Sequence, residues 1–408
     1  MVGGGVKRYQ RRSLGGLLVG VVVAALWAPG LAVAGVVSTA RVSVSSAGVQ
    51  ADGASSVVAV SADGRYVLFN SKATNLVAGD TNRVQDVFLR DRVLGKTFRV
   101  SGGNSHRQAN GASWGQAVTP DGRFVVFISA ATNLVGGDTN HRRDVFVRDR
   151  KTGRVYRVSL SPPGDQFLVL RSMSAHISAD GRWVLFNQGA FSTCLSGGAG
   201  SIGCREKVFL RHRVSGGVTA AIDPTSPLLE GQAISADARY VVLTASDDKG
   251  DETDVIYRDR LTNHETQIDR YAPGNCTCGL GSSMTPDGRY VVFSPLAGDQ
   301  FAAVRWTRGA TTVVPVASAV SYPAGISDDG RYVGYVSNTQ VPDLFRNDLL
   351  TNVVTRIDLT STGRPIPTGA TGLLSGDDAY AVFQTADPNV VPDDTNHTTD
   401  VFIRGPLP

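Results

Sequence analysis

The sequence predicts an all-β protein, a seven-bladed β-propeller of four-stranded blades in which an N-terminal strand completes the last blade. The first observation behind this prediction is a repeated segment, Ser61-Ala-Asp-Gly-Arg-Tyr-Val-Leu-Phe69. Related segments begin at Thr119, Ser178, Ser235, Thr285, Ser327 and Ser375, at spacings of 58, 59, 57, 50, 42 and 48 residues. A recurring period of this size is typical of repeat architectures.

The second observation is a hairpin signal inside each repeat. In the first repeat we expect strand A at 56–60, strand B at 65–70, strand C at 86–90 and strand D at 97–101. An Asp-Gly pair between apolar runs, here Asp63-Gly64, is a strong hairpin signal. Strand B is apolar at alternate positions on both of its faces, so both faces must be covered, as they are between stacked blades.

The third observation is an incomplete last repeat. The seventh repeat stops after its strand C, Asp400-Val-Phe-Ile-Arg404. Thr39-Ala-Arg-Val-Ser43 matches strand D of the first repeat, Thr97-Phe-Arg-Val-Ser101, but has no strands A to C before it. We therefore expect this early strand to complete the seventh blade, because the pairing removes two open sheet edges.

The first 34 residues have the composition of a signal peptide. A basic stretch (Lys7, Arg8, Arg11 and Arg12) precedes an apolar run at 17–26 and a small-residue cleavage site at 32–34. We expect a secreted or cell-envelope protein whose mature chain, 35–408, is a single propeller domain without a membrane span; an uncleaved anchor is the alternative. The mature chain has 36 basic and 36 acidic residues, so its charge does not indicate nucleic-acid binding.

Four cysteines fit an exported protein with disulfides. We favour a bond between Cys194 and Cys204, which would close a glycine-rich loop, and a second between Cys276 and Cys278. The second bond would span a single intervening residue, which needs backbone accommodation. A zinc site is the alternative, although the cysteine spacing lacks a typical zinc motif.

Three loops between strands B and C are nearly identical: TNLVAGDTNRVQD (74–86), TNLVGGDTNHRRD (132–144) and PNVVPDDTNHTTD (388–400). They belong to blades one, two and seven, which become neighbours when the ring closes. Each presents Asp-x-Asn-x-x-x-Asp, a pattern of oxygen ligands that suits calcium. The alternative is that the first Asp of each loop closes an Asx-turn and the last Asp bonds main-chain N–H groups. The candidate calcium ligands are Asp80, Asn82, Asp86, Asp138, Asn140, Asp144, Asp394, Asn396 and Asp400.

The Ser-x-Asp-Gly-Arg-Tyr pair of strands and the NLVxGDTN…DVFxRD stretch resemble the TolB-type, WD-repeat-like β-propeller family of exported bacterial proteins. The resemblance covers residues 36–405 and only the propeller part of TolB. It implies the propeller fold. Because such blades occur in binding proteins, protease accessory domains and some polysaccharide lyases, it does not imply one function.

Other candidate functional residues lie on the same face of the ring or near its axis. We expect Trp114, at the mouth of the central channel, and His141 and His397, in the loops between strands B and C, to contribute to binding. Gly111-Ala-Ser113-Trp-Gly115 matches a nucleophile-elbow motif but begins an innermost strand instead of joining a strand to a helix. The Asp and Arg residues that follow each strand A are expected to pair locally rather than to bind a partner.

The sequence therefore predicts a monomeric, non-catalytic binding scaffold that uses its B–C and D–A loops. An unknown protein or carbohydrate is the expected partner, and calcium is the one cofactor that the sequence suggests. The alternative is a secreted polysaccharide lyase or hydrolase with a site in the central channel, for which no catalytic residues could be nominated.

Overall fold

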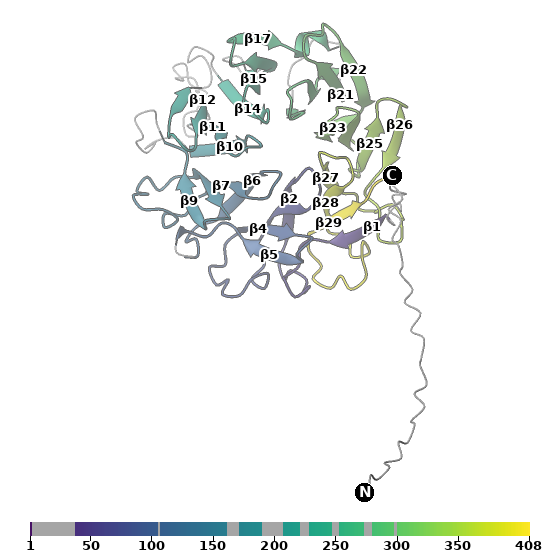
Figure 1. Ribbon diagram of the computed structural model, residues 1–408. Helices are drawn as coiled ribbons and strands as arrows, with labels where there is room; N and C mark the ends of the chain where they lie inside the picture. Colours follow the sequence, from purple (N-terminus) through teal and green to yellow (C-terminus); the bar gives the residue numbers. More distant parts are fainter. Residues whose placement is uncertain are drawn as a thin grey trace, which may run out of the picture. The chain divides into compact units, whose positions relative to one another are not determined.

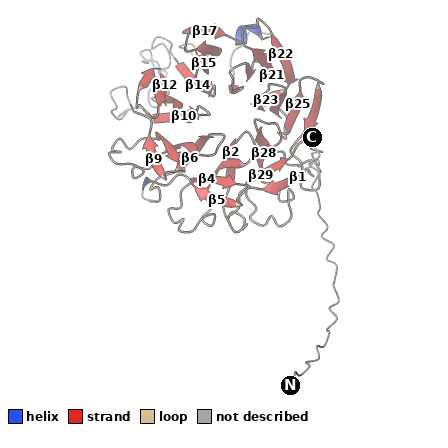
Figure 2. Ribbon diagram, in the orientation of Figure 1, coloured by secondary structure: helices blue, strands red, loops and turns tan. Residues whose placement is uncertain are grey.

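The computed structural model describes residues 37–104, 107–160, 171–189, 207–220, 228–246, 253–272, 280–297 and 300–408, together with residue 1. These residues form seven antiparallel sheets, arranged as the blades of a propeller around a common axis (Figure 1). The predicted all-β, seven-bladed fold is confirmed. Strands make up almost all of the regular structure (Figure 2).

The first four blades each contain four strands in sequence order, with strand A innermost. The strands of the first four blades are β2 (Ser55–Val60), β3 (Tyr66–Ser71), β4 (Asp86–Asp91) and β5 (Lys96–Arg99); β6 (Ser113–Val118), β7 (Phe124–Ser129), β8 (Asp144–Asp149) and β9 (Arg154–Arg157); β10 (Arg171–Ile177), β11 (Trp183–Gly189), β12 (Lys207–His212) and β13 (Val218–Ala220); β14 (Leu228–Ile234), β15 (Tyr240–Ser246), β16 (Thr253–Asp259) and β17 (His264–Gln267). A short 3-10 helix, η2 (Asp269–Tyr271), follows β17.

The fifth blade departs from this plan because a short extra strand pairs with its third long strand. Its strands are β18 (Leu280–Met284), β19 (Tyr290–Ser294), β20 (Leu296–Ala297), β21 (Gln300–Thr307) and β22 (Val313–Ser318). Blade six contains β23 (Val320–Ile326), β24 (Tyr332–Ser337), β25 (Leu344–Asp348) and β26 (Val353–Arg356). The degenerate sequence of the fifth repeat did not predict the added strand.

The seventh sheet joins the two ends of the described chain. It contains β27 (Thr371–Leu374), β28 (Ala381–Thr385), β29 (Asp400–Gly405) and β1 (Ser38–Arg41). β1 pairs with β29 in antiparallel register, with Ser38 opposite Gly405 and Arg41 opposite Phe402. The outer edge of β29 is therefore covered by β1, which lies near the start of the described chain.

The hydrophobic core is divided among the spaces between neighbouring blades. Val67 and Phe69 of β3 pack toward blade seven, whereas Tyr66 and Leu68 of the same strand pack toward blade two. The strand is buried on both faces, as its two apolar rows predicted. At about 25 cal/mol per Å² of buried apolar surface, this inter-blade packing is the main source of stability for a chain built only of short strands.

At four junctions between neighbouring blades, the same contact on the A–B side joins one blade to the next. The ring of Tyr66 in blade one lies against the turn Gly122 of blade two, where an added Cβ would stand 2.5 Å from the ring. Arg150 of blade two stacks on the same ring at 5.4 Å and donates a hydrogen bond of 2.7 Å to the Gly122 carbonyl. The corresponding trios are Tyr380–Gly64–Arg92, Phe124–Gly181–Arg213 and Tyr240–Gly288–Arg308.

The charged residues of the A–B turns pair locally, as the sequence indicated. Asp63 accepts hydrogen bonds from Ser61 Oγ (2.6 Å) and from the main-chain N–H of Arg65 (3.0 Å). The Arg65 guanidinium binds both oxygens of Asp91, at 3.1 and 2.9 Å. The same bidentate pairs form at Arg123–Asp149, Arg239–Asp259 and Arg331–Asp348. These four arginines of the A–B side are therefore each paired within their own blade.

We expect Gly122→Ala to lower the free energy of unfolding by about 2–4 kcal/mol, because the added Cβ meets the Tyr66 ring and the residue keeps a φ of +65°. Gly153→Ala is the matched control, since Gly153 has a φ of +73° and no atom within 4 Å of its added Cβ. The control should lose only about 1 kcal/mol. Urea unfolding of the two variants measures the difference, and equal losses would contradict the inter-blade contact.

Candidate functional site

The three predicted loops lie on the face of the ring opposite the A–B turns. In blade one the loop runs from β3 to β4 and is hydrogen-bonded to the preceding D–A loop, 42–54. Asn75 Nδ2 donates to the carbonyl of Gln50 (2.7 Å), and Asn75 Oδ1 accepts from the N–H of Asp52 (3.1 Å). Leu76 is fully buried beneath the loop. The Asn-Leu pair of the motif thus fixes the loop on the scaffold.

The two aspartates of the blade-one loop converge on an arginine from strand D. Arg99 Nη1 lies 3.2 Å from Asp80 Oδ1 and 3.7 Å from Asp86 Oδ2. All three side chains are largely buried, with exposed fractions of 14% for Arg99, 3% for Asp80 and 1% for Asp86. A guanidinium therefore occupies the space between the carboxylates that the sequence assigned to a calcium ion.

Neutral groups donate further hydrogen bonds to these carboxylates. Gln108 Nε2, from the D–A loop that follows blade one, donates to Asp80 Oδ1 at 2.8 Å. Asp86 accepts hydrogen bonds from Ser101 Oγ (2.5 Å) and from Asn82 Nδ2 (3.0 Å). These hydrogen bonds offset part of the cost of burying the two carboxylates.

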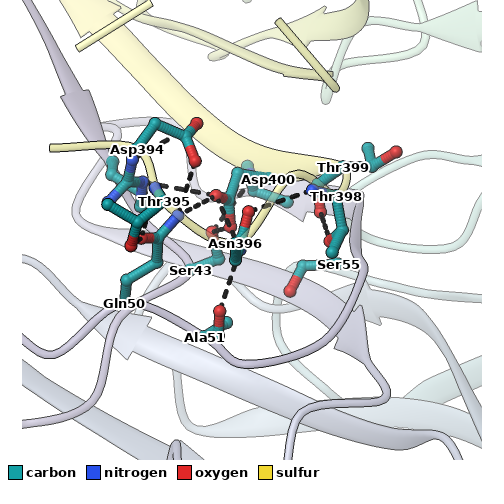
Figure 3. Close-up of polar contacts among 12 residues, drawn as sticks. Ser43, Gln50, Ala51, Ser55, Asp394, Thr395, Asn396, Thr398, Thr399 and Asp400 are labelled. Carbon is teal, nitrogen blue, oxygen red and sulfur yellow. Dashed lines mark hydrogen bonds and ion pairs between the residues drawn. The ribbon is translucent and has the colours of Figure 1, made fainter. Parts of the chain in front are cut away.

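Blade seven repeats this network with residues from both ends of the chain (Figure 3). Arg41 of β1 lies 3.3 Å from Asp394 and 3.4 Å from Asp400. Gln50 Nε2 donates to both carboxylates, at 2.7 and 2.9 Å, and Ser43 Oγ donates to Asp400 at 2.5 Å. The network therefore also ties the first strand to the last repeat.

Blade two contains the same ion pairs. Arg157 Nη1 lies 3.3 Å from Asp138 Oδ1 and 3.7 Å from Asp144 Oδ2, and Asn140 Nδ2 donates to Asp144 at 3.1 Å. The register of the repeat places Gln166 where Gln50 and Gln108 stand, but Gln166 lies outside the described residues.

Burial shifts the protonation of these carboxylates. It raises the pKa of Asp80 to about 6, and the nearby Asp86 charge raises it further against the opposing effect of Arg99. Burial likewise raises the pKa of the aspartates Asp86, Asp138, Asp144 and Asp400. A raised pKa shows that the arginine only partly offsets the cost of removing two carboxylates from water.

The Asx-turns of the loops are closed by asparagine and not by aspartate. Asn82 Oδ1 accepts from the N–H of Val84 at 3.2 Å, and Asn140 and Asn396 accept in the same way from the second residue beyond them. The alternative interpretation correctly predicted Asx-turns in these loops. It assigned them to the first aspartate of each loop, whereas the asparagine closes them. Likewise, Asp86 bonds side chains, where that interpretation expected main-chain N–H groups.

The sequence interpretation missed the arginines Arg41, Arg99 and Arg157 and the glutamines Gln50 and Gln108. A signal was present, because each arginine stands two residues before a serine in the repeated strand D. Among the described residues, no three His, Cys, Asp or Glu side chains come together in a way that could hold a metal. Calcium binding at the loops stays a prediction.

The predicted binding residues are brought to one face but not to one point. His141 and His397 are exposed at equivalent loop positions with φ of 53° and 54°, where blade one has the exposed Arg83. Trp114 lies on β6, and the guanidinium of Arg143 stacks on its ring at 4.1 Å. The cysteines Cys194, Cys204, Cys276 and Cys278 lie outside the described residues, as does the predicted leader at 2–34.

Two titratable residues on innermost strands were not foreseen. Burial lowers the pKa of His176 on β10 to about 4. Burial raises the pKa of Glu230 on the neighbouring β14. Both shifts favour the uncharged form.

Within the described ranges, no helix has the length and apolar character needed to cross a bilayer.

Comparisons with known proteins support the fold without naming a family. No protein-family model and no curated protein matches the sequence. An oligogalacturonate lyase in complex with manganese is similar at 12% identity and a TM-score of 0.62, over 92% of this chain and 94% of that one. Oligogalacturonate lyase from Vibrio parahaemolyticus is also similar, at 12% identity and 0.59, over 90% and 93%. TolB from Acinetobacter baumannii has 13% identity and a TM-score of 0.45, over 74% of this chain and 63% of that one.

Replacing the buried arginine should destabilise the protein strongly. We expect Arg99→Met to cost about 3–5 kcal/mol at pH 8, because it leaves two buried carboxylates without a cation. The loss should be smaller at pH 5. A carboxyl whose pKa is higher in the folded than in the unfolded protein takes up protons on folding. Its contribution to stability therefore falls as the pH rises from the unfolded pKa to the folded pKa. Lys96→Met, on an exposed side chain of the same strand, is the control. Urea unfolding at both pH values measures the effect, and matching losses in the two variants would contradict it.

Calcium should change the stability of the native protein little. A ligand that binds only the folded state raises the melting temperature by mass action. Because Arg99 and its equivalents already stand between the carboxylates, we expect thermal unfolding in millimolar calcium and in chelator to agree within about 1 °C. A rise of several degrees would instead establish the calcium sites that the sequence predicts.

Proposed function

We propose that this chain is an exported, non-catalytic binding module that recognises its partner through the face formed by the B–C and D–A loops. The observation that carries the proposal is a difference between the two faces. Four of the arginines that follow strand A on the A–B side, Arg65, Arg123, Arg239 and Arg331, are held in bidentate pairs with aspartate. The face of blades seven, one and two instead presents exposed basic side chains.

The exposed basic residues of this face are Lys72, Arg83, Arg107, Arg142 and Arg143. None of them forms an ion pair with another described residue. The carboxylates of the same loops are buried against Arg41, Arg99 and Arg157, so they do not neutralise the exposed cations. Among the described residues of these loops, Asp52 and Asp393 are the exposed acidic residues. Loops of fixed shape that carry unpaired charge suit recognition.

A secreted polysaccharide lyase or hydrolase is the second candidate. It is favoured by His176 and Glu230, because titratable groups with shifted pKa on adjacent inner strands are frequent in active sites. The likeness to oligogalacturonate lyases is a likeness of fold at 12% identity and adds no catalytic residues.

A photo-crosslinking residue placed at Ala78, exposed in the blade-one loop, should capture the partner in extracts of the cell envelope. The same residue at the exposed Lys151, in a C–D turn on the other face, is the control and should capture none. Equal capture from both positions would contradict the assignment of the face. Turnover by the purified protein on polysaccharide or ester substrates, lost in Glu230→Gln, would establish the enzyme instead.

A further inference from the structure

We infer that Asn110 is a self-modification site, at which deamidation removes the side-chain amide and leaves an aspartate. This inference goes beyond the proposed function and does not depend on it. It is carried by the residue that follows Asn110, by the exposure of the pair and by blade one, which already has an aspartate at the same place.

Asn110 and Gly111 directly precede β6, and they form the only Asn-Gly pair in the sequence. A glycine after an asparagine lets the main chain turn back on the side chain, because no Cβ obstructs the approach. The Gly111 nitrogen can then attack the Asn110 Cγ atom and close a five-membered succinimide ring. The sequence therefore marks this pair as the most reactive site among the asparagines of the chain.

Water and hydroxide can reach this pair. Asn110 is exposed and Gly111 is half-buried. Of the residues that the structure describes, none accepts a hydrogen bond from the Gly111 N–H, whereas the Asn110 N–H donates to Asn133 Oδ1 at 3.1 Å. The nitrogen that must lose its proton before the attack is therefore not held by a described acceptor.

Thr132, in the B–C loop of blade two, contacts both polar atoms of the Asn110 amide. Its N–H donates to Oδ1 at 2.9 Å, and its Oγ1 accepts from Nδ2 at 2.9 Å. Attack on Cγ moves negative charge onto Oδ1, and a main-chain N–H that already points at this oxygen stabilises the charge as it develops. The Thr132 N–H therefore favours the addition step.

The reaction consumes water and releases ammonia. The Gly111 nitrogen loses its proton to hydroxide and bonds to Cγ, after which the Cγ–Nδ2 bond breaks and Nδ2 leaves as ammonia. Water then opens the ring: its oxygen bonds to Cγ, the bond from Cγ to the Gly111 nitrogen breaks, and this nitrogen regains a proton. Asparagine and water thus become aspartate and ammonium, without an oxidant, a reductant or a cofactor.

Blade one shows how the product would be held. Asp52, which precedes Gly53, occupies the position of Asn110 in the repeat. Its Oδ1 accepts from the Thr74 N–H at 2.6 Å, and its Oδ2 accepts from Thr74 Oγ1 at 2.7 Å. Thr74 corresponds to Thr132, so the product needs only a rotation of the Thr132 hydroxyl to form the same two bonds. Hydrogen bonds to a charged acceptor are shorter and stronger than those to a neutral amide.

The packing of Gly111 favours the normal aspartyl product. Opening of the ring at its other carbonyl would pass the main chain through the side chain and lengthen it by one carbon. There is little room for this, because a Cβ added at Gly111 would stand 2.8 Å from main-chain atoms of Ala130 and Ala131. The Asn110 N–H is also fixed by its bond to Asn133. We therefore expect aspartate, and not isoaspartate, at this position.

The test follows the purified protein as it ages. Native protein is kept in heavy-oxygen water at pH 8 and at pH 5, beside a sample unfolded in urea, and its peptides are mapped by mass spectrometry. We expect the Asn110 peptide of the native protein to gain one heavy oxygen at least tenfold faster than the peptides of Asn75 and Asn133, which precede leucine. The reaction should be faster at pH 8, because the attacking nitrogen must first lose its proton.

Two variants define the chemistry and its product. Asn110→Gln should keep its amide, because its longer side chain would have to close a six-membered ring. Asn110→Asp should match the aged protein in charge, in melting temperature and in cleavage by a protease that cuts before aspartate.

Three results would overturn the inference. Retention of the Asn110 amide in the native protein would show that the fold protects the pair, most clearly if the urea-unfolded chain loses it. Equal rates at Asn110 and at Asn75 or Asn133 would remove the role of the glycine. An aged protein that melts below Asn110→Asp and resists the protease at this position would contain isoaspartate, and would reject a product held as in blade one.

Discussion

The contact between an aromatic ring, a turn glycine and a stacked arginine is the constraint on which the ring depends. A blade of four short strands cannot bury its own two faces, so it must be covered by a neighbour on each side. The Tyr66–Gly122–Arg150 trio sets how closely these two blades approach, because a Cβ added at Gly122 would stand 2.5 Å from the Tyr66 ring. Ala238 and Asp378 stand at two of the turn positions and still adopt a positive φ, which shows that neighbouring blades impose the turn.

On the opposite face, the main physical constraint is the burial of charged side chains. The loops of blades one, two and seven bury two carboxylates each, and an arginine from strand D compensates them. Because Arg41 comes from the first strand and Asp400 from the last repeat, the same ion pair also connects the ends of the chain. The exposed cations of the loops form no ion pair with another described residue, so the arginines that stabilise the face differ from the cations that it exposes.

Much of the fold could be predicted from the sequence, because the signals are local. Asp63 and Gly64 define a turn on their own, and the alternation from Tyr66 to Phe69 reveals a strand covered on both sides. The candidate site was harder. The aspartates were recognised as a pattern of oxygen ligands, but Arg99 looked like an ordinary strand residue, and Gln50 is separated from Asp394 by nearly the whole chain. The groups that compensate the buried aspartates come from distant parts of the sequence. The repeat motif therefore reveals the aspartates, but it does not reveal the arginine that lies between them.

The most direct test of this account is a double-mutant cycle on Asp80 and Arg99, measured by urea unfolding at pH 8. If the arginine compensates the buried carboxylate, Arg99→Met should cost clearly less stability in the background of Asp80→Asn than in the native protein. We predict a coupling energy of at least about 1 kcal/mol, within the range of contacting charged pairs. Additive losses would show that the guanidinium and the carboxylate do not depend on each other, and would contradict the role assigned to the loops.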